Sequence, residues 1–196
     1  MPSSRREGTA AIGSVYRSAM VKSLTLAMTV ALALAASSAA RERPRGVVAD
    51  CAMQSGASFP GAFTSSRNLV VGPLAIVGAR GTPPFSSSFH GQKFPLLLKV
   101  GHRVTLELSN STRRGAALAY GPLPQGDVGV PEAHRVVTFI ACRRGASDSE
   151  ADGKPVTFWS GGVLVRSPRC VPLRVWIDGA SSPRRVVIRL GVDRCR

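Results

Sequence analysis

The chain has 196 residues and a formal net charge of +15, with 26 lysines and arginines against 11 acidic residues. Hydrophobic residues make up 44% of it, so the chain is long and apolar enough to enclose the core of one ordinary domain. The few acids form no evident pair on an apolar strand face. This disfavours glycosidase chemistry, which needs two carboxyl groups on opposite sides of the bond that is cleaved.

The first 40 residues carry the features of an export signal. An apolar run, residues 23–36, is followed by the small residues of 37–40. Four basic residues precede the run: Arg5, Arg6, Arg17 and Lys22. This order predicts a signal peptide over residues 1–40, cleaved near its end, with Met20 as an alternative start. An uncleaved membrane anchor is disfavoured, because the apolar run is shorter than the roughly 20 residues of a spanning helix.

Cleavage leaves residues 41–196 with a net charge of +12, almost all of it from arginine. Residues 41–50 are charged and contain proline, which predicts a mobile lead-in, and residues 51–196 then form the folded domain. The predicted strands of this domain span 68–79, 93–100, 103–109, 116–121, 135–142, 156–166, 170–178 and 184–192. No window shows a helical period. We therefore expect an all-β fold, a single antiparallel β-sandwich, with an immunoglobulin-like arrangement as one form of it.

Hydrophobic alternation supports the sandwich. The segments 103–109, 170–178 and 184–192 each place apolar residues on one side and polar residues on the other. One packed side and one solvent-facing side is typical of an antiparallel sheet. The segment 135–142 is apolar on both sides, which predicts a central strand that is covered on both faces.

Four cysteines, Cys51, Cys142, Cys170 and Cys195, lie beyond the signal. An even number of cysteines in an exported chain indicates two disulfides, and three pairings are possible. We expect Cys142–Cys170 and Cys51–Cys195, because the first pair borders successive strands and the second flanks the domain. A zinc site is disfavoured, since no CxxC or HxxxH spacing is present. We expect neither a metal nor a cofactor.

Three longer loops, residues 80–92, 121–134 and 143–155, separate the predicted strands. The last of them contains Asp148, Glu150 and Asp152. Their spacing matches the first half of an EF-hand calcium loop. The position of its closing glutamate is taken by Trp159, so the loop cannot be completed. A solvated loop is therefore expected rather than a calcium site.

Ser160 is the one candidate nucleophile, in the sequence "FWSGG". A serine hydrolase would need His90, His102 or His134 within hydrogen-bonding reach, and a third group to orient that histidine. The pattern is not the G-x-S-x-G of a nucleophile elbow. The glycines at 161 and 162 instead predict a strand that bends there. A hydrolase acting on cell-envelope material is kept as the alternative function.

The basic charge provides the leading functional hypothesis. Four residues are predicted on the outward faces of the last two strands: Arg174, Trp176, Arg185 and Arg189. Arginines beside an exposed aromatic ring can bind phosphates, carboxylates or sugar rings. The polyanions met by an exported protein are anionic cell-wall polymers and lipid head groups, and nucleic acid is excluded by compartment. The alternative is that these arginines only keep the protein soluble and bind no ligand.

The order of four segments, 68–79, 91–106, 158–179 and 184–195, resembles a group of uncharacterised exported proteins from actinobacteria. The resemblance spans most of the chain from Cys51 onward and rests on strand-like blocks and cysteines. It implies a small exported all-β domain and transfers no functional residue. Together these observations predict a secreted or envelope-associated protein, non-enzymatic, with a binding or structural role and a basic face.

Overall fold

The computed structural model describes residues 46–112, 114–125 and 128–195. The predicted signal peptide, residues 1–40, and the first half of the predicted lead-in lie outside the described residues. Within these ranges the chain forms thirteen strands and one 3-10 turn, Cys51–Met53, so the all-β prediction is confirmed. No helix in this part of the chain is long and apolar enough to span a membrane.

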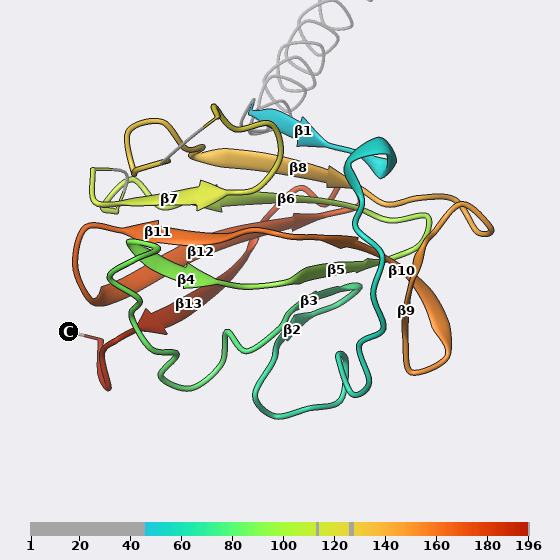
Figure 1. Cartoon of the computed structure of the whole chain (residues 1–196), viewed down its shortest axis with the longest axis horizontal. Coiled ribbons are helices and arrows are strands. Elements are labelled where there is room, and N and C mark those ends of the chain that lie inside the picture. Colours follow the sequence, from blue (N-terminus) through green and yellow to red (C-terminus); the bar gives the residue numbers. More distant parts are fainter. Residues whose placement is uncertain (1–45, 113, 126–127, 196) are drawn as a thin grey trace, which may run out of the picture. The chain divides into compact units, whose positions relative to one another are not determined.

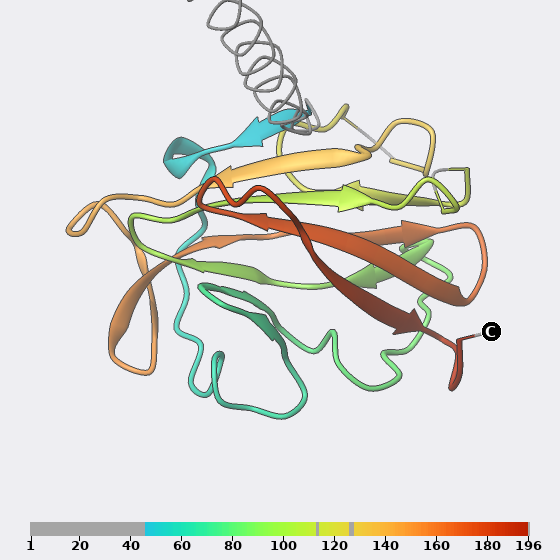
Figure 2. The same ribbon diagram turned by 180° about the vertical axis from the view of Figure 1, so that it is seen from behind.

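The first sheet has five strands in the order β1-β8-β6-β12-β13. Their bounds are Val47–Ala49 for β1, Val136–Ile140 for β8, Arg103–Leu108 for β6, Arg169–Ile177 for β12 and Arg184–Leu190 for β13. β1 runs parallel to β8, and all the other neighbours are antiparallel. Figure 2 shows β12 and β13, in orange-red and dark red, side by side at one edge of this sheet.

Two further groups of strands form the second layer (Figure 1). The group β2-β3-β5-β10-β9 spans Leu69–Val71, Leu74–Ile76, Leu96–Lys99, Lys154–Trp159 and Ser149–Ala151. The group β4-β11-β7 spans Gly91–Lys93, Gly162–Val165 and Ala116–Ala119. The chain passes directly from β4 to β5 and from β10 to β11. Between them the Phe94 N–H donates to the Gly161 carbonyl at 2.8 Å, so the two groups form one bent layer.

The main core lies between the two layers. Apolar side chains of β6 and β12 join those of β3, β5 and β11 in a single buried cluster, on the sides that the alternation predicted. Phe139 packs edge to face against Tyr120 and Trp159, with ring centroids 5.4 and 5.2 Å apart, and such pairs stabilise beyond their area of burial. The Tyr120 hydroxyl donates to the Phe94 carbonyl at 2.7 Å, and burial raises its pKa.

Loops cover the outer face of the second layer in two places. One satellite cluster comprises Ala62, Ala75, Leu97, Ala151 and Val156, with Phe59, Phe63, Val77 and Phe158 packed against it. The other comprises Ala117, Ala119, Val130, Ala133 and Leu164, with Phe89, Leu123 and Val128 packed against it. A sandwich of two layers is therefore confirmed, and an immunoglobulin-like arrangement stays a prediction.

Strand boundaries differ from the predictions in several places, and residues 93–100, for example, are divided between β4 and β5. Residues 68–79 form the hairpin β2–β3 rather than one strand, because Gly72 turns the chain at a φ of +60°. The loop 143–155 contains β9, and Asp152 and Gly153 have φ values of 53° and 70°, as in the type I′ turn of a tight hairpin. Residues 47–49, predicted to be mobile, pair with β8 as β1.

The disulfides are Cys51–Cys142 and Cys170–Cys195, so the predicted pairs Cys142–Cys170 and Cys51–Cys195 are wrong. The sheet explains why. β8 and β12 both run antiparallel to β6, so the end of β8 and the start of β12 lie at opposite ends of the sheet. Parallel pairing of β1 with β8 instead brings Cys51 beside Cys142, and the antiparallel β12–β13 pair returns Cys195 towards Cys170.

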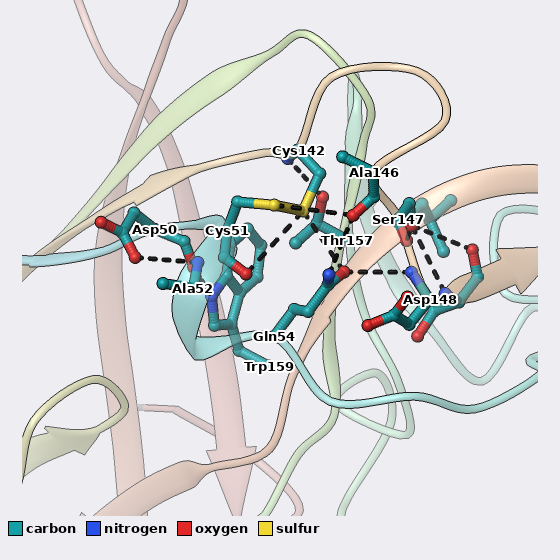
Figure 3. The surroundings of a disulfide bond; sticks show 12 residues. Asp50, Cys51, Ala52, Gln54, Cys142, Ala146, Ser147, Asp148, Thr157 and Trp159 are labelled. Carbon is teal, nitrogen blue, oxygen red and sulfur yellow. Dashed lines mark hydrogen bonds between the residues drawn. A yellow bond between two sulfur atoms is a disulfide. The ribbon is translucent and has the colours of Figure 1, made fainter.

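Figure 3 shows the surroundings of the Cys51–Cys142 bridge. The side chain of Gln54 lies beside it: Nε2 donates to the Ala146 carbonyl at 2.9 Å, and Oε1 accepts from the Asp148 N–H at 3.1 Å. The Trp159 indole N–H donates to the Asp50 carbonyl at 2.9 Å. The bridge therefore joins the turn after β1 to the loop after β8, directly over β10.

Candidate functional site

The predicted basic face does not have the form that the sequence indicated. Arg174, Trp176, Arg185 and Arg189 do share one face of the first sheet, by the register of β12 and β13. Trp176, however, is only 6% exposed. Its indole N–H donates to Glu107 Oε2 at 3.3 Å on the neighbouring strand β6. The prediction of an exposed aromatic ring at this face is wrong.

Two of the three arginines on this face are held by protein groups. Arg174 donates to Glu107 Oε1 at 3.3 Å, and that carboxylate is 4% exposed. Arg189 donates to the carbonyls of Gly81 at 3.1 Å and Asp193 at 3.0 Å. Only Arg185, among these described residues, is exposed with no hydrogen bond or ion pair of its side chain. One such arginine is a weak basis for a binding face.

The three histidines lie in different surroundings. His102 Nδ1 lies 2.6 Å from Asp178 Oδ2, and His134 Nε2 lies 2.7 Å from the Pro122 carbonyl oxygen. His90, by contrast, lines the same pocket as Ser160. Ser160 is exposed at the bend between β10 and β11, where the glycines were predicted to bend the strand.

This pocket, the Ser160 pocket, has a volume of about 380 Å³. Its lining residues are Ser88, Phe89, His90, Lys93, Ala119, Leu123, Val128, Ser160, Gly161 and Leu164. No hydrogen bond joins Ser160 to His90, and none of these lining residues is an acid. A Ser-His mechanism requires both the hydrogen bond and a group that orients the histidine. The pocket therefore brings the two candidates together without assembling a triad.

Two of the three acidic residues of 143–155 serve as structural acceptors. Glu150 Oε1 accepts from the Ser58 hydroxyl at 3.1 Å, and Asp152 Oδ1 accepts from the Gly61 N–H at 2.5 Å. Both bonds tie the segment before β2 to the β9–β10 hairpin. Within the described ranges no group of three or more His, Cys, Asp or Glu side chains could hold a metal ion.

A larger hollow, which we call the lysine groove, has a volume of about 1000 Å³. Its lining residues are Phe63, Thr64, Lys99, Val100, Arg144, Ala151, Asp152, Lys154, Pro155 and Val156. Lys99 ends β5 and Lys154 begins β10, on the face that carries the first satellite cluster. The Lys99 Nζ lies 4.9 Å from the centroid of the Phe63 ring.

The groove combines positive charge with an apolar floor. Lys99, Lys154 and Arg144 are all exposed, and Ala151 and Val156 are buried beneath them. The one acid of the lining, Asp152, already accepts the Gly61 N–H. Such a surface attracts an anion and also accommodates an apolar group next to it.

Sequence reasoning missed the groove because its residues come from four separate segments of the chain. One compositional feature could have indicated it. After residue 40 the sequence has 22 basic residues and only three of them are lysines: Lys93, Lys99 and Lys154. Lys93 lines the Ser160 pocket, and the other two line the lysine groove.

No family model, no curated protein and no solved structure matches the chain. The structure of the described residues shows a two-layer β-sandwich with a lysine groove and a smaller pocket at Ser160. It also shows two disulfides, which indicate an oxidising compartment.

Proposed function

We propose that this chain is an exported, non-enzymatic binding domain that holds anionic material of the cell envelope in the lysine groove. The observation that carries the proposal is the meeting of Lys99, Lys154 and Arg144 over an apolar floor in a hollow of about 1000 Å³. The apolar floor favours an anionic lipid, with its head group between the cations, over a purely polar cell-wall polymer. The residues proposed for the contact thus move from the face of β12 and β13 to the groove.

Charge and compartment support this proposal. The net charge of +12 after residue 40 attracts anions over a distance and raises their local concentration. The groove cations then provide the local contacts, each worth about 1 kcal/mol against an anionic membrane surface. Two disulfides and the predicted signal peptide agree with a protein that acts outside the cytoplasm.

A vesicle-binding experiment tests the proposal. Protein with both disulfides formed is mixed with vesicles of phosphatidylglycerol or of phosphatidylcholine, and binding is measured by co-sedimentation at low and at high salt. We expect binding to phosphatidylglycerol only, weakened by salt because salt screens exposed charges. The triple variant Lys99→Met, Lys154→Met and Arg144→Met should bind about a hundredfold more weakly.

A matched variant separates the groove from general charge. Arg166, Arg184 and Arg185 are exposed and lie outside the groove, so replacing all three by methionine removes the same charge elsewhere. We expect this variant to retain most of the affinity. Equal losses in the two triple variants would contradict the groove, and equal binding to both kinds of vesicle would contradict the proposal as a whole.

A hydrolase acting on envelope material is the second candidate, supported by the presence of Ser160 and His90 in one pocket. Hydrolysis of p-nitrophenyl esters by the purified protein, with Ser160→Ala as the comparison, decides between the two functions. Turnover that disappears in Ser160→Ala favours the hydrolase. The binding domain predicts no difference between the two proteins.

A further inference from the structure

The Ser160 pocket lies over the second satellite cluster, on the strands β4, β11 and β7. The lysine groove lies over the first satellite cluster, on the strands β5, β9 and β10. The pocket shares no lining residue with the groove. Four of its residues bear polar side chains, all exposed: Ser88, His90, Lys93 and Ser160. We propose that it is a second binding site, for a small carboxylate that carries a short apolar group. This inference does not depend on the function of the groove.

The loop that carries His90 is held firmly in place. Ser86 and Gly91 exchange two backbone hydrogen bonds of 2.7 and 3.0 Å, and the His90 carbonyl accepts from the Val165 N–H at 2.8 Å. His90 itself has a φ of +50°, the left-handed conformation of a tight turn, in which histidine is one of the more frequent residues other than glycine. The imidazole is left without a partner among the described residues.

Ser160 lies in the bend between β10 and β11, and Lys93 is the last residue of β4, which pairs with β11. Both residues line the pocket. The side chain of Ser160 has no hydrogen bond to any described residue, and the bend that presents it is fixed by the Phe94 N–H bond to the Gly161 carbonyl. The Lys93 Nζ lies 5.5 Å from the centroid of the Phe89 ring. An ammonium held over an aromatic ring remains available to an anion on its other side.

The opposite wall of the pocket is apolar. Phe89, Leu123 and Val128 are partly buried against Leu164 and Ala119, which are 1% and 5% exposed. At about 380 Å³ the hollow lies at the small end of the range for ligand sites. A short alkyl or aromatic group therefore fits against this wall, while a long acyl chain does not.

The polar groups select the charge of the ligand. Lys93 is the one lysine or arginine of the lining, and no acid is among the lining residues. A hydroxyl, an ammonium and an imidazole N–H all donate to an anion, and two carboxylate oxygens suffice to accept from them. A monoanion matches this set, so a carboxylate is the class of ligand that we assign.

The chain provides a matched pair of variants for the test. Lys93 lies over Phe89 in the pocket, and Lys99 lies over Phe63 in the groove. Both lysines are exposed, and methionine keeps most of each side chain while removing its charge. Lys93→Met should therefore affect only the pocket, and Lys99→Met only the groove.

Hexanoate and benzoate are the probes, and each is titrated into ¹⁵N-labelled protein while amide chemical shifts are recorded. Hexanol serves as the uncharged comparison, and acetate serves as the comparison without an apolar tail. We expect saturable shifts of the amides of residues 88–93 and 160–164 with the two probes, and weaker binding of both comparisons. Lys93→Met should weaken binding at least about tenfold and Ser160→Ala several-fold, with Lys99→Met unchanged.

Three results would overturn the assignment. Shifts that do not saturate, hexanol binding as tightly as hexanoate, or equal weakening by Lys93→Met and Lys99→Met would each show that no carboxylate site exists here. Failure of vesicle binding with intact hexanoate binding would instead contradict only the function proposed for the groove, so the two proposals fail separately.

Discussion

The ionisation of Asp178 makes the stability of the domain depend on pH. Its carboxylate accepts from the Arg103 N–H at 2.8 Å and lies 2.6 Å from His102 Nδ1. Partial burial raises the pKa of Asp178, but the Arg103 N–H and the His102 ring stabilise the charged form and hold the pKa below its ordinary value overall. The ionised carboxylate therefore joins the turn after β12 to the start of β6.

The sign of the pH dependence follows from this lowered pKa. Asp178 stabilises the fold fully above the pKa of an unfolded aspartate, about 3.9, and this contribution disappears as the pH falls through the folded value. Asp178→Asn should lower the free energy of unfolding at neutral pH by about 1 kcal/mol or less, since the pair is exposed. Urea unfolding at neutral pH and at a pH below the folded pKa of Asp178 measures the loss, which should vanish at the acid end.

Asp148→Asn is the control for that experiment. The Asp148 side chain is exposed and makes no hydrogen bond with the described residues, so we expect its replacement to leave the unfolding curve unchanged at both pH values. An effect of Asp178→Asn that is the same at neutral and acid pH would contradict the role of the ionised carboxylate.

For single residues, the side of the strand that a side chain takes was easier to predict than the groups to which it bonds. The sequence placed Trp176 and Arg174 on the outward face correctly, because alternation depends on neighbours in the chain. It could not indicate that Glu107 lies on the adjacent strand and accepts from both side chains. A tryptophan that is outward by parity was therefore read as exposed, although its cross-strand partners bury it.

Gly161 lies next to Ser160 in the bend between β10 and β11, where the chain packs closely against Tyr120. A Cβ atom at position 161 would overlap the Tyr120 ring and the Ala119 carbonyl. The ring cannot yield, because it is buried against Phe139 and its hydroxyl is bonded to the Phe94 carbonyl. Gly161→Ala should therefore lower the free energy of unfolding by about 1–3 kcal/mol, the usual cost of overpacking. Chemical denaturation measures this loss.

Ser160→Ala is the matched control one residue away. Its side chain is exposed and unbonded among the described residues, so the stability should stay within about 0.5 kcal/mol of the parent chain. Comparable losses at 160 and 161 would show that close approach to Tyr120 is not the reason for the glycine.

Elements of the core were predicted well and hairpin edges were not. Strands β12 and β13 have a regular alternation that follows from burial of one side. β6 alternates in sequence, although Thr105 and Glu107 on its polar side are buried as well. The short strand β9 has only three residues and is set by the turn at Asp152 and Gly153. An Asp-Gly pair was available in the sequence as a turn indicator, but the acidic composition of the segment indicated a loop instead.

For the whole molecule, the layered architecture explains where the lysine groove and the Ser160 pocket form. Loops cover only parts of the outer face of the second layer, and each hollow lies at the border of one covered part. A sandwich could be predicted from strand periodicity. The hollows could not, since the lysine groove gathers Phe63, Lys99, Arg144 and Lys154 from segments whose proximity depends on the pairing of β5, β9 and β10.

The disulfide pairs provide the test of the topology of the whole molecule. Mass mapping of non-reduced peptides should find Cys51 joined to Cys142 and Cys170 joined to Cys195. The bridges close loops with sequence separations of 91 and 25 residues. In the chain-entropy relation these are worth about 4.6 and about 3.5 kcal/mol. Replacing both Cys51 and Cys142 by serine should thus destabilise the domain more than the same change at Cys170 and Cys195.

Thermal unfolding of the two double variants, each compared with the fully reduced parent chain, measures that difference. The reduced parent should be less stable than either variant, because it lacks both bridges. A peptide that joins Cys142 to Cys170 would contradict the parallel pairing of β1 with β8, since that pairing is what places Cys51 next to Cys142. Detection of Cys51 joined to Cys195 would contradict the arrangement at both ends of the first sheet.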